Sequence, residues 1–362
     1  MNKKKRFIIF ILLLPIISFS QKAESDFSLV DSFATTVKYK SNLSELTNEL
    51  VKPFSTELDK ARVIFRWITE NIQYDFKYYN KYRIKGVDPP TFKCKNEQEC
   101  EAKRVAYEEK CIEKAVKNNK AVCLGYALLY KKMCEIAGLK AEFLAGYVRS
   151  EPYQVGTAGI LDHAWNAVRI DSVYYLLDVT WAAGGCAKDE DGNLLNFQKG
   201  FNDYYWLTPA DQFARNHFPQ NNKWTLLPNY TKDSFAANPY YLPGEIQHIK
   251  LISPRSGIIA VKKGDTIHFK VEYKGYFKDL QINSNLFRNP DIWVFDEVGK
   301  GNKVRRMDSL ALKKQKYINY TVNGRIYEFQ YVITDPSVYY LEVLFDRKRM
   351  LRFKINVDKS GL

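Results

Sequence analysis

Apolar residues recur every three or four positions along three stretches of the N-terminal half. The stretches cover about residues 24–58, 57–71 and 123–137, and Gly138 follows the last of them. This spacing places apolar side chains on one face of a helix, and glycine commonly ends one. We therefore predict helices in all three stretches.

Shorter apolar runs follow the third helix. They cover residues 141–147, 164–170 and 173–179, and the pair Asp171-Ser172 separates the last two. Runs of this length bounded by turn residues are typical of strands, and a two-residue polar break indicates a hairpin. We predict an α+β domain in which the helix that begins at Cys123 packs on an antiparallel sheet.

The segment 76–118 separates the second helix from the third. It is polar and rich in charge, and its pattern becomes helical only around residues 97–117. We interpret the segment as an insertion before the helix that begins at Cys123.

After about Pro239 apolar and polar residues alternate, with Gly, Pro, Asn and Asp between the runs. Alternation is typical of strands that bury one face. The clearest runs are Thr266–Val271, Tyr327–Ile333, Val338–Phe345 and Leu351–Val357. We predict an all-β sandwich of roughly seven strands over residues 236–362. The α+β domain would then occupy residues 21–235.

The N-terminus has the parts of an export signal. Four basic residues at 3–6 precede an apolar core at 7–19, and Ser18 and Ser20 have the spacing that a signal peptidase reads. We expect a signal peptide over residues 1–20 and a secreted or periplasmic protein with no membrane span after cleavage. An uncleaved membrane anchor is the alternative.

Charge gives little functional direction. The formal net charge is +14, and +10 remains without the four basic residues of the predicted signal. The surplus is spread along the chain and no nucleic-acid motif is present, so we expect no nucleic-acid partner. A generally basic surface is the favoured interpretation, with attraction to anionic polymers or membranes as the alternative.

Three short strings carry a thiol, an imidazole and a carboxylate in that order. They are Val122-Cys123-Leu124-Gly125-Tyr126-Ala127, Asp162-His163-Ala164-Trp165-Asn166 and Leu177-Asp178-Val179-Thr180-Trp181. In a nucleophilic acyl-transfer site, histidine takes the thiol proton and a carboxylate orients the imidazole. A helix N-terminus and a nearby imidazolium both favour the thiolate. We predict catalytic roles for Cys123, His163 and Asp178.

Each of these residues has a plainer interpretation in isolation. A cysteine at a helix start is more often structural, a histidine before Ala-Trp is usually packed or exposed, and Asp178 could simply cap a turn. The order, the spacing and the flanking aromatic residues together favour the catalytic interpretation.

The remaining cysteines could form disulfides, because export to an oxidising compartment favours pairing of thiols. Cys134 lies on an apolar helix face and is expected to be a buried thiol. The four that could form two disulfides are Cys94, Cys100, Cys111 and Cys186. At least one bridge is expected among the first three. A zinc site is the alternative, although no C-x-x-C pair or nearby histidine supports it.

The three strings resemble the motifs of the transglutaminase-like superfamily of papain-type cysteine enzymes. The family pattern is Cys-x-Gly-Tyr-Ala, then His-Ala-Trp, then Asp-x-Thr-Trp, and the chain matches all three in order. The segment 67–75 looks like the family's entry helix, and Asn216-His217-Phe218-Pro219 is similar to the kyphoscoliosis-peptidase branch. The resemblance covers about residues 58–228. It implies a papain-like catalytic domain, followed in that branch by a β-rich region.

The oxyanion donors are less clearly marked than the triad. The amide of Cys123 is one expected donor. Crosslinking transglutaminases carry an upstream tryptophan for this purpose, but the nearest one here, Trp67, lies in an amphipathic helix and is expected to pack. Gln73 and Tyr74 are the candidates for the second donor.

Further residues are assigned to the substrate cleft. Gly125 would leave room for a substrate backbone in the first helical turn, and Trp165 would form a wall of the cleft. Trp181 is expected in the core. His217 is either a groove residue or, as we favour, a buried structural histidine.

These residues predict an exported cysteine enzyme. It would form a thioester with a peptide or amide carbonyl and pass the acyl group to water, with transfer to an amine as a variant. The partners would be a protein or peptide substrate and an envelope or extracellular protein. A non-catalytic transglutaminase-like interaction module is the alternative. No cofactor or metal is expected, since the acidic turn at 189–193 lacks the glutamate that completes a calcium loop.

Overall fold

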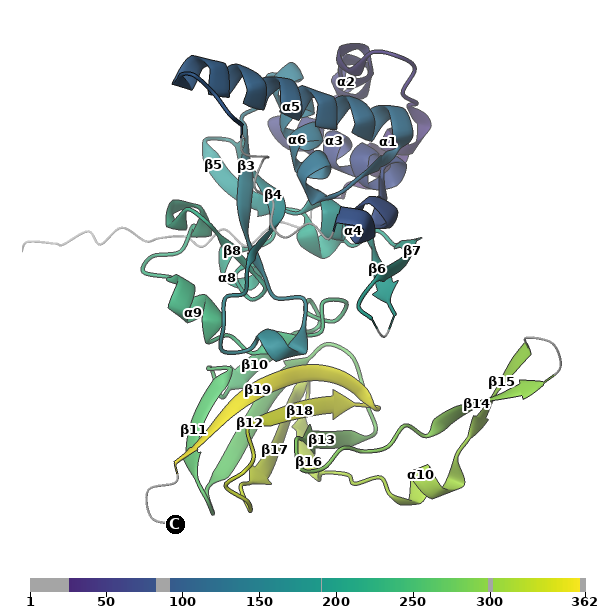
Figure 1. Ribbon diagram of the computed structural model, residues 1–362, viewed down its shortest axis with the longest axis vertical. Helices are drawn as coiled ribbons and strands as arrows, with labels where there is room; N and C mark the ends of the chain where they lie inside the picture. Colours follow the sequence, from purple (N-terminus) through teal and green to yellow (C-terminus); the bar gives the residue numbers. More distant parts are fainter. Residues whose placement is uncertain (1–25, 83–91, 190, 299–301, 359–362) are drawn as a thin grey trace, which may run out of the picture.

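The computed structural model describes residues 26–82, 92–189, 191–298 and 302–358. The predicted signal peptide lies outside these ranges. The described residues form two large hydrophobic cores, one among the helices and a first sheet and the other between two further sheets. Figure 1 shows the helical part above and the β-rich part below.

Helices dominate the first part of the chain. The α-helices described are α1 (Ser28–Thr36), α2 (Leu43–Val51), α3 (Glu57–Asn71), α4 (Phe76–Tyr82), α5 (Glu97–Asn118), α6 (Cys123–Ile136), α7 (Val179–Ala183), α8 (Ala210–Phe213), α9 (Lys232–Ala236) and α10 (Ser309–Lys313). Short 3-10 turns are η1 (Pro152–Gln154), η2 (Asp203–Tyr205) and η3 (Asn222–Thr225).

The helices predicted over 57–71 and from Cys123 are confirmed. The helix predicted over 57–71 is α3, and Thr56 caps it by accepting a hydrogen bond from the Asp59 amide at 3.0 Å. The helix predicted from Cys123 is α6, and Gly138 follows it with φ +75°, a conformation that glycine adopts without strain. The stretch predicted over 24–58 contains two helices, α1 and α2, rather than one.

A first group of strands lies beside these helices. It consists of β1 (Gln73–Tyr74), β2 (Lys120–Ala121), β3 (Ala141–Val148), β4 (Leu161–Ile170), β5 (Val173–Leu177), β6 (Gly184–Lys188), β7 (Leu194–Lys199) and β8 (His217–Pro219). An antiparallel sheet has the order β5-β4-β3-β8, and α6 contacts β3 and β4. The predicted α+β arrangement, with the cysteine helix on an antiparallel sheet, is therefore confirmed. Asp171 and Ser172 form the predicted hairpin turn, both with positive φ.

The segment 76–118 contains α4 and α5, and α5 matches the helix predicted over 97–117. The C-terminal half of α5 places Ile112, Ala115 and Val116 in the helical core. This half is thus built into the domain, and the interpretation of the whole segment as an insertion stays a prediction.

Two of the cysteine predictions are confirmed: Cys94 and Cys100 form a disulfide, and Cys134 is a fully buried thiol. Cys111 and Cys186 carry free thiols, so they do not form the second bridge that was possible.

The C-terminal part is the predicted β-sandwich. Its strands are β9 (Tyr240–Tyr241), β10 (Ile249–Ser253), β11 (Ile258–Lys262), β12 (Thr266–Tyr273), β13 (Leu280–Ser284), β14 (Trp293–Val298), β15 (Asn302–Met307), β16 (Tyr320–Asn323), β17 (Ile326–Val332), β18 (Tyr340–Phe345) and β19 (Lys348–Asp358). One sheet has the order β10-β12-β17-β16 and the other β11-β19-β18-β13, with β9 paired to β19.

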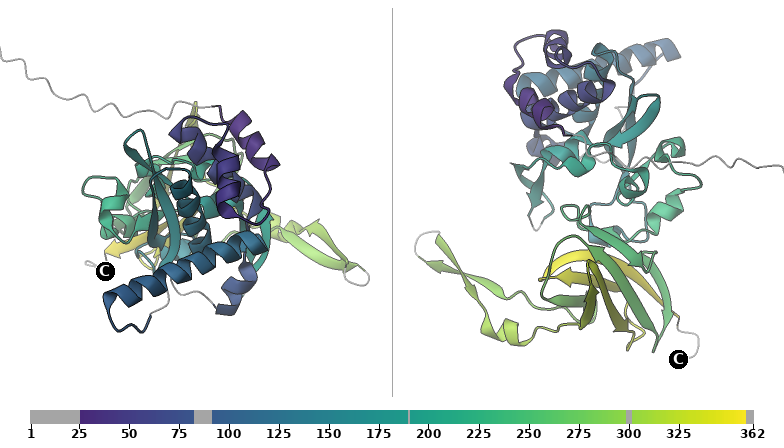
Figure 2. Two further views of the ribbon diagram at one scale, coloured as in Figure 1. Left: turned by 90° about the horizontal axis from the view of Figure 1, so that it is seen from above. Right: turned by 180° about the vertical axis from the view of Figure 1, so that it is seen from behind.

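The expectation of strands alone in this part was wrong. The connection between β13 and β16 contains α10 and the β14–β15 hairpin, which project from the sandwich in both views of Figure 2. Alternation does not distinguish a projecting hairpin from a strand of the sandwich, because both are extended.

Buried Arg149 connects residues on both sides of the predicted boundary at 235/236. Its guanidinium donates to the carbonyls of Phe235 and Asn238. The boundary stays a prediction. Within the described ranges no helix is long and apolar enough to cross a membrane.

Candidate active site

Cys123 is the first residue of α6, where its side chain lies beside the unpaired amides of the first turn. Two anchors fix this end of the helix. The parallel pairing of β1 with β2 ends one residue before Val122, the N-cap. The hydroxyl of Tyr126 donates to the Ile72 carbonyl at 2.6 Å. Only 6% of Cys123 is exposed.

His163 lies on β4, which packs against α6. Asn166, three residues further along β4, donates from Nδ2 to the Ala127 carbonyl of α6 at 3.0 Å and to the Glu142 carbonyl of β3 at 3.1 Å. This side chain therefore sets the position of the strand relative to the helix, and with it the position of His163 relative to Cys123.

The imidazole of His163 has a partner on each side. Its Nε2 lies 2.7 Å from Oδ2 of Asp178, and the thiol of Cys123 lies close enough to the ring to raise its pKa. Since Asp178 occupies Nε2, Nδ1 is the nitrogen left for the sulfur. The structure thus brings the three sequence-predicted residues together, with a hydrogen bond between His163 and Asp178 and Cys123 beside the same ring.

Asp178 is fully buried and lies one residue beyond β5. It was expected on the strand, but it is the N-cap of α7: its Oδ1 accepts from the amides of Thr180 at 2.8 Å and Trp181 at 3.0 Å. The capping interpretation and the catalytic interpretation of Asp178 are therefore compatible, because each uses a different carboxylate oxygen.

A second histidine reaches the same carboxylate. Nε2 of His217, on β8, lies 3.1 Å from Oδ2 of Asp178, and its ring stacks on Phe213 at 4.2 Å between centroids. His217 is buried, as we favoured, but its contact with Asp178 was not predicted. The only available signal was the Asn-His-Phe-Pro string itself, without a partner.

The two histidines differ in protonation. Burial alone would lower the pKa of His163, but the Asp178 carboxylate and the Cys123 thiol raise it to about 10. Burial dominates at His217 and lowers its pKa to about 4, although Asp178 opposes this. Burial would raise the pKa of Asp178, but His163 and His217 hold it well below the ordinary value. At neutral pH the site therefore holds a carboxylate, one imidazolium and one neutral imidazole.

A neutral His217 carries a single ring proton. Placed on Nε2, this proton is donated to Asp178, and Nδ1 becomes an acceptor 2.7 Å from the Asn216 amide group. Rotation of that amide by 180° presents its NH₂ to Nδ1 and its oxygen to the hydroxyl of Tyr205, which lies 3.4 Å from the Asn216 side chain. Every polar atom of His217 is then satisfied.

Aromatic rings surround the two histidines. Trp181 is half-buried with its ring 5.4 Å from that of His163, whereas Trp165 is only 1% exposed and lies 5.0 Å from the His217 ring. Trp181, expected in the core, is thus the tryptophan with exposed surface beside His163. Trp165, expected in the cleft wall, is buried beside both histidine rings.

Gly125 is buried as well. A methyl group at this position would lie 2.9 Å from Cβ of Ala121 and 3.9 Å from Cβ of Ala115, so glycine allows α6 to approach β2 and α5 closely. Gly125 serves packing here, and its predicted role toward a substrate stays a prediction.

The two candidate oxyanion donors lie on β1, beside the strand that leads to Cys123. Gln73 is exposed. Tyr74 has a pKa raised well above the ordinary value by burial and by Cys123 and neighbouring groups, so its hydroxyl stays protonated. The exposed Gln73 amide and the protonated Tyr74 phenol can both donate hydrogen bonds, and the choice between them stays a prediction.

The only cluster of potential metal ligands within the described ranges belongs to this site. Ligand atoms of His163, Asp178 and His217 lie within 4.8 Å of one another. Both histidine Nε2 atoms already hydrogen-bond to the same Asp178 oxygen. A metal ion would have to replace these bonds.

Comparison with known proteins agrees with the resemblance that the three motifs indicated. Residues 41–183 match the family model described as a transglutaminase-like domain. The chain is similar to kyphoscoliosis peptidase of Homo sapiens, with 32% identity over 218 residues, 59% of this chain and 29% of the relative. The corresponding protein of Mus musculus is 32% identical over 203 residues, 56% of this chain and 27% of the relative.

Among solved structures, the chain is similar to one described as the crystal structure of a TGase. The match covers 48% of this chain and 37% of the TGase chain, with 16% identity and a TM-score of 0.27. The chain spans less than a third of the length of the two peptidases.

Proposed function

We propose that the transglutaminase-like domain is a cysteine acyl-transfer enzyme that hydrolyses peptide or amide bonds through a thioester. The observation that carries this proposal is the hydrogen bond between His163 and Asp178 beside Cys123, with an imidazolium favoured at His163. This arrangement has the nucleophile, the base and the orienting group of a cysteine acyl-transfer site.

Acylation would begin when the Cys123 proton resides on His163. The sulfur attacks the substrate carbonyl carbon, and the carbonyl oxygen becomes an oxyanion that the Cys123 amide and one donor from β1 stabilise. When the tetrahedral intermediate collapses, the C–N bond breaks and His163 gives its proton to the departing nitrogen. The products are an amine and a thioester on Cys123.

Deacylation would reverse these roles with water. His163, now neutral, takes a proton from water as the oxygen attacks the thioester carbonyl. The C–S bond then breaks, His163 returns the proton to sulfur, and a carboxylic acid leaves. A primary amine in place of water would give an amide by the same steps, which is the transamidation variant.

Incubating the protein with a glutamine-containing peptide and a fluorescent primary amine separates these outcomes. Hydrolysis predicts release of ammonia without incorporation of the label, and transamidation predicts both. Cleavage of the peptide backbone would indicate peptidase activity. A Cys123→Ala variant with the same thermal transition must show none of these, and activity retained by it would contradict the proposal.

A non-catalytic interaction module is the second candidate, and one observation favours it. Cys123 and His163 are only 6% and 5% exposed, so the sulfur has little free surface for a substrate. A module of this kind would keep the hydrogen bond between His163 and Asp178 as part of its fold and show no Cys123-dependent turnover.

We further propose that the protein is exported. The disulfide between Cys94 and Cys100 supports this, because disulfides persist in oxidising compartments. Fractionation of the producing cell, with N-terminal sequencing of the mature chain, tests this proposal. A chain that starts near residue 21 in the exported fraction is expected, and an intact N-terminus in the cytosol would contradict it.

A further inference from the structure

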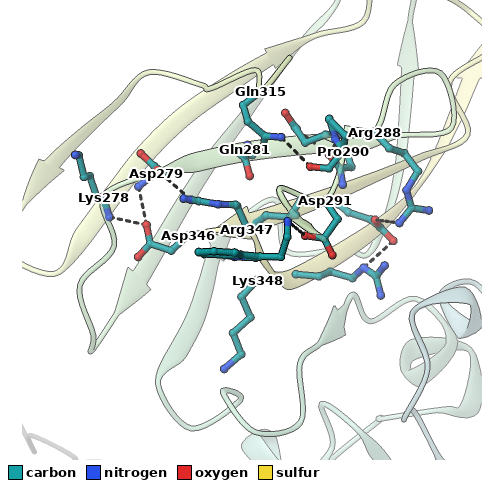
Figure 3. Close-up of a pocket in the computed structure, with 16 residues that line it drawn as sticks. Lys278, Asp279, Gln281, Arg288, Pro290, Asp291, Gln315, Asp346, Arg347 and Lys348 are labelled. Atoms are coloured by element: carbon teal, nitrogen blue, oxygen red, sulfur yellow. Dashed lines mark hydrogen bonds and ion pairs between the residues drawn. The ribbon is translucent and has the colours of Figure 1, made fainter. Parts of the chain in front are cut away.

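A polar pocket lies on the sandwich, away from the cysteine site. Its volume is about 920 Å³, within the range of small-ligand pockets, about 300–1,000 Å³. Gln281 and Asn283 of β13 and Glu342 of β18 contribute to its lining, together with the connection that carries β14 and α10. Figure 3 shows Lys278 and Arg288 among the labelled side chains around it.

The orientation of one lining group is fixed by its neighbours. Nε2 of Gln315 donates to the carbonyls of Pro290 at 2.8 Å and Ala311 at 3.0 Å, so its Oε1 faces Gln281. Gln281 must then present Nε2, which it does at 2.7 Å. Oε1 of Gln281 is left as a buried acceptor without a partner, on a side chain with no exposed surface.

Glu342 supplies a second acceptor on the same side of the sheet. The residue is fully buried, and its Oε1 lies 2.9 Å from both Arg349 and Arg352. Its Oε2 accepts no hydrogen bond and has only the ion pair with Arg288, at 3.5 Å. Since 55% of the Arg288 side chain is exposed, this is the ion pair that a ligand could displace most easily.

The charges around the pocket are largely paired. Arg347 pairs with Asp279, and Lys348 pairs with Glu245. The guanidinium groups near Glu342 already form ion pairs with its carboxylate, so an anionic ligand would have to compete with Glu342 for them. The groups left without a partner are acceptors, so a ligand should donate hydrogen bonds to them. The surrounding positive charge disfavours a cationic donor.

We propose that this pocket binds a neutral carbohydrate through its hydroxyl groups. Both acceptors are buried, so binding requires the two side chains to turn toward the pocket; hydroxyls of the sugar would then donate to Oε1 of Gln281 and Oε2 of Glu342, and could accept from Arg288. Trp293, which also lines the pocket, would pack against the apolar face of the sugar ring. Arg305 covers one face of this indole at 3.8 Å, so the sugar would use the other face.

The test measures binding of maltose, cellobiose, lactose and N,N′-diacetylchitobiose to the full chain, by saturation-transfer NMR and tryptophan fluorescence. We expect saturable binding of at least one disaccharide. Gln281→Met, which keeps the length of the side chain and removes the acceptor, should weaken it roughly tenfold. The exposed Gln220→Met is the matched control and should leave binding unchanged.

The remaining outcomes also decide the proposal. Binding by none of the four disaccharides, unchanged binding by a folded Gln281→Met, or displacement of the sugar by inorganic phosphate would overturn it. If Gln281→Met fails to fold, Trp293→Ala takes its place, and unaltered binding by that variant would overturn the proposal. Cys123→Ala should bind as wild type does, so the result is independent of any catalytic activity.

Discussion

Asp178 holds Nε2 of His163 at 2.7 Å with one carboxylate oxygen and caps α7 with the other. One side chain therefore both starts a helix and orients the proposed base. The two tasks can be separated experimentally, because an amide can perform one of them without the charge that the other requires.

Asp178→Asn should separate the two tasks. Asparagine keeps an oxygen for the α7 amides but loses the negative charge that raises the pKa of His163. We expect alkylation of Cys123 by iodoacetamide at pH 6 to fall at least tenfold. Asp178→Ala loses the cap as well and should cost about 1 kcal/mol more in the free energy of unfolding. Equal alkylation rates in wild type and Asp178→Asn would show that the carboxylate does not serve the thiol.

His217 should make the fold sensitive to acid. Its pKa is lowered to about 4 from an ordinary value of 6.5, because burial favours the neutral ring. Its contribution to stability is therefore present above about pH 6.5 and is lost as the pH falls through about 4. The loss is on the order of 3 kcal/mol.

Urea unfolding between pH 7 and pH 4 measures this contribution. The slope of unfolding free energy against pH should be shallower in His217→Gln than in wild type. Exposed His268→Gln is the control and should keep the wild-type slope. Parallel curves for His217→Gln and wild type would refute a neutral, buried His217.

Gln73→Ala and Tyr74→Phe should identify the second oxyanion donor. Loss of the true donor is expected to reduce turnover of an amide substrate by about a hundredfold. The same variant should leave the rate of alkylation by iodoacetamide unchanged, since that reaction forms no oxyanion. If both variants keep wild-type turnover, the donor lies elsewhere.

Gly125→Ala should destabilise the protein although alanine favours helices by up to about 1 kcal/mol. The new methyl group would lie 2.9 Å from Cβ of Ala121, and relief of this contact requires α6 to move from β2. We expect a net loss of about 1–2 kcal/mol in urea unfolding. Gly185→Ala meets no heavy atom within 4 Å and is the control. A stabilised Gly125→Ala would show that the helix start has room.

The sequence was most informative where structure is local. Helical periodicity predicted α3 and the start of α6 at Cys123, because a buried helix face repeats within a single segment. The strings around His163 and Asp178 identified both residues before their contact was known. The switch from β5 to α7 at Asp178 was missed, since Val179 continues the apolar run of the strand.

The features that the sequence did not predict depend on contacts between segments far apart in the chain. His217 reaches Asp178 because β8 pairs with β3, where Val148 faces His217, and a three-residue strand carries no periodicity that predicts its partner. The pocket around Gln281 depends on a connection that folds back over the outer face of a sheet. Polar residues on a strand normally indicate exposure to water, so its burial could not be predicted.

The rate of alkylation of Cys123 at pH 6 is the most direct test of the account. At this pH a thiol without activation is almost entirely protonated and reacts slowly, whereas a thiolate paired with the His163 imidazolium reacts fast. Mass spectrometry after brief exposure to iodoacetamide should show modification of Cys123 well ahead of Cys111 and Cys186, and His163→Ala should abolish this difference. Equal rates at the three cysteines in the wild-type protein would contradict the proposed enzyme.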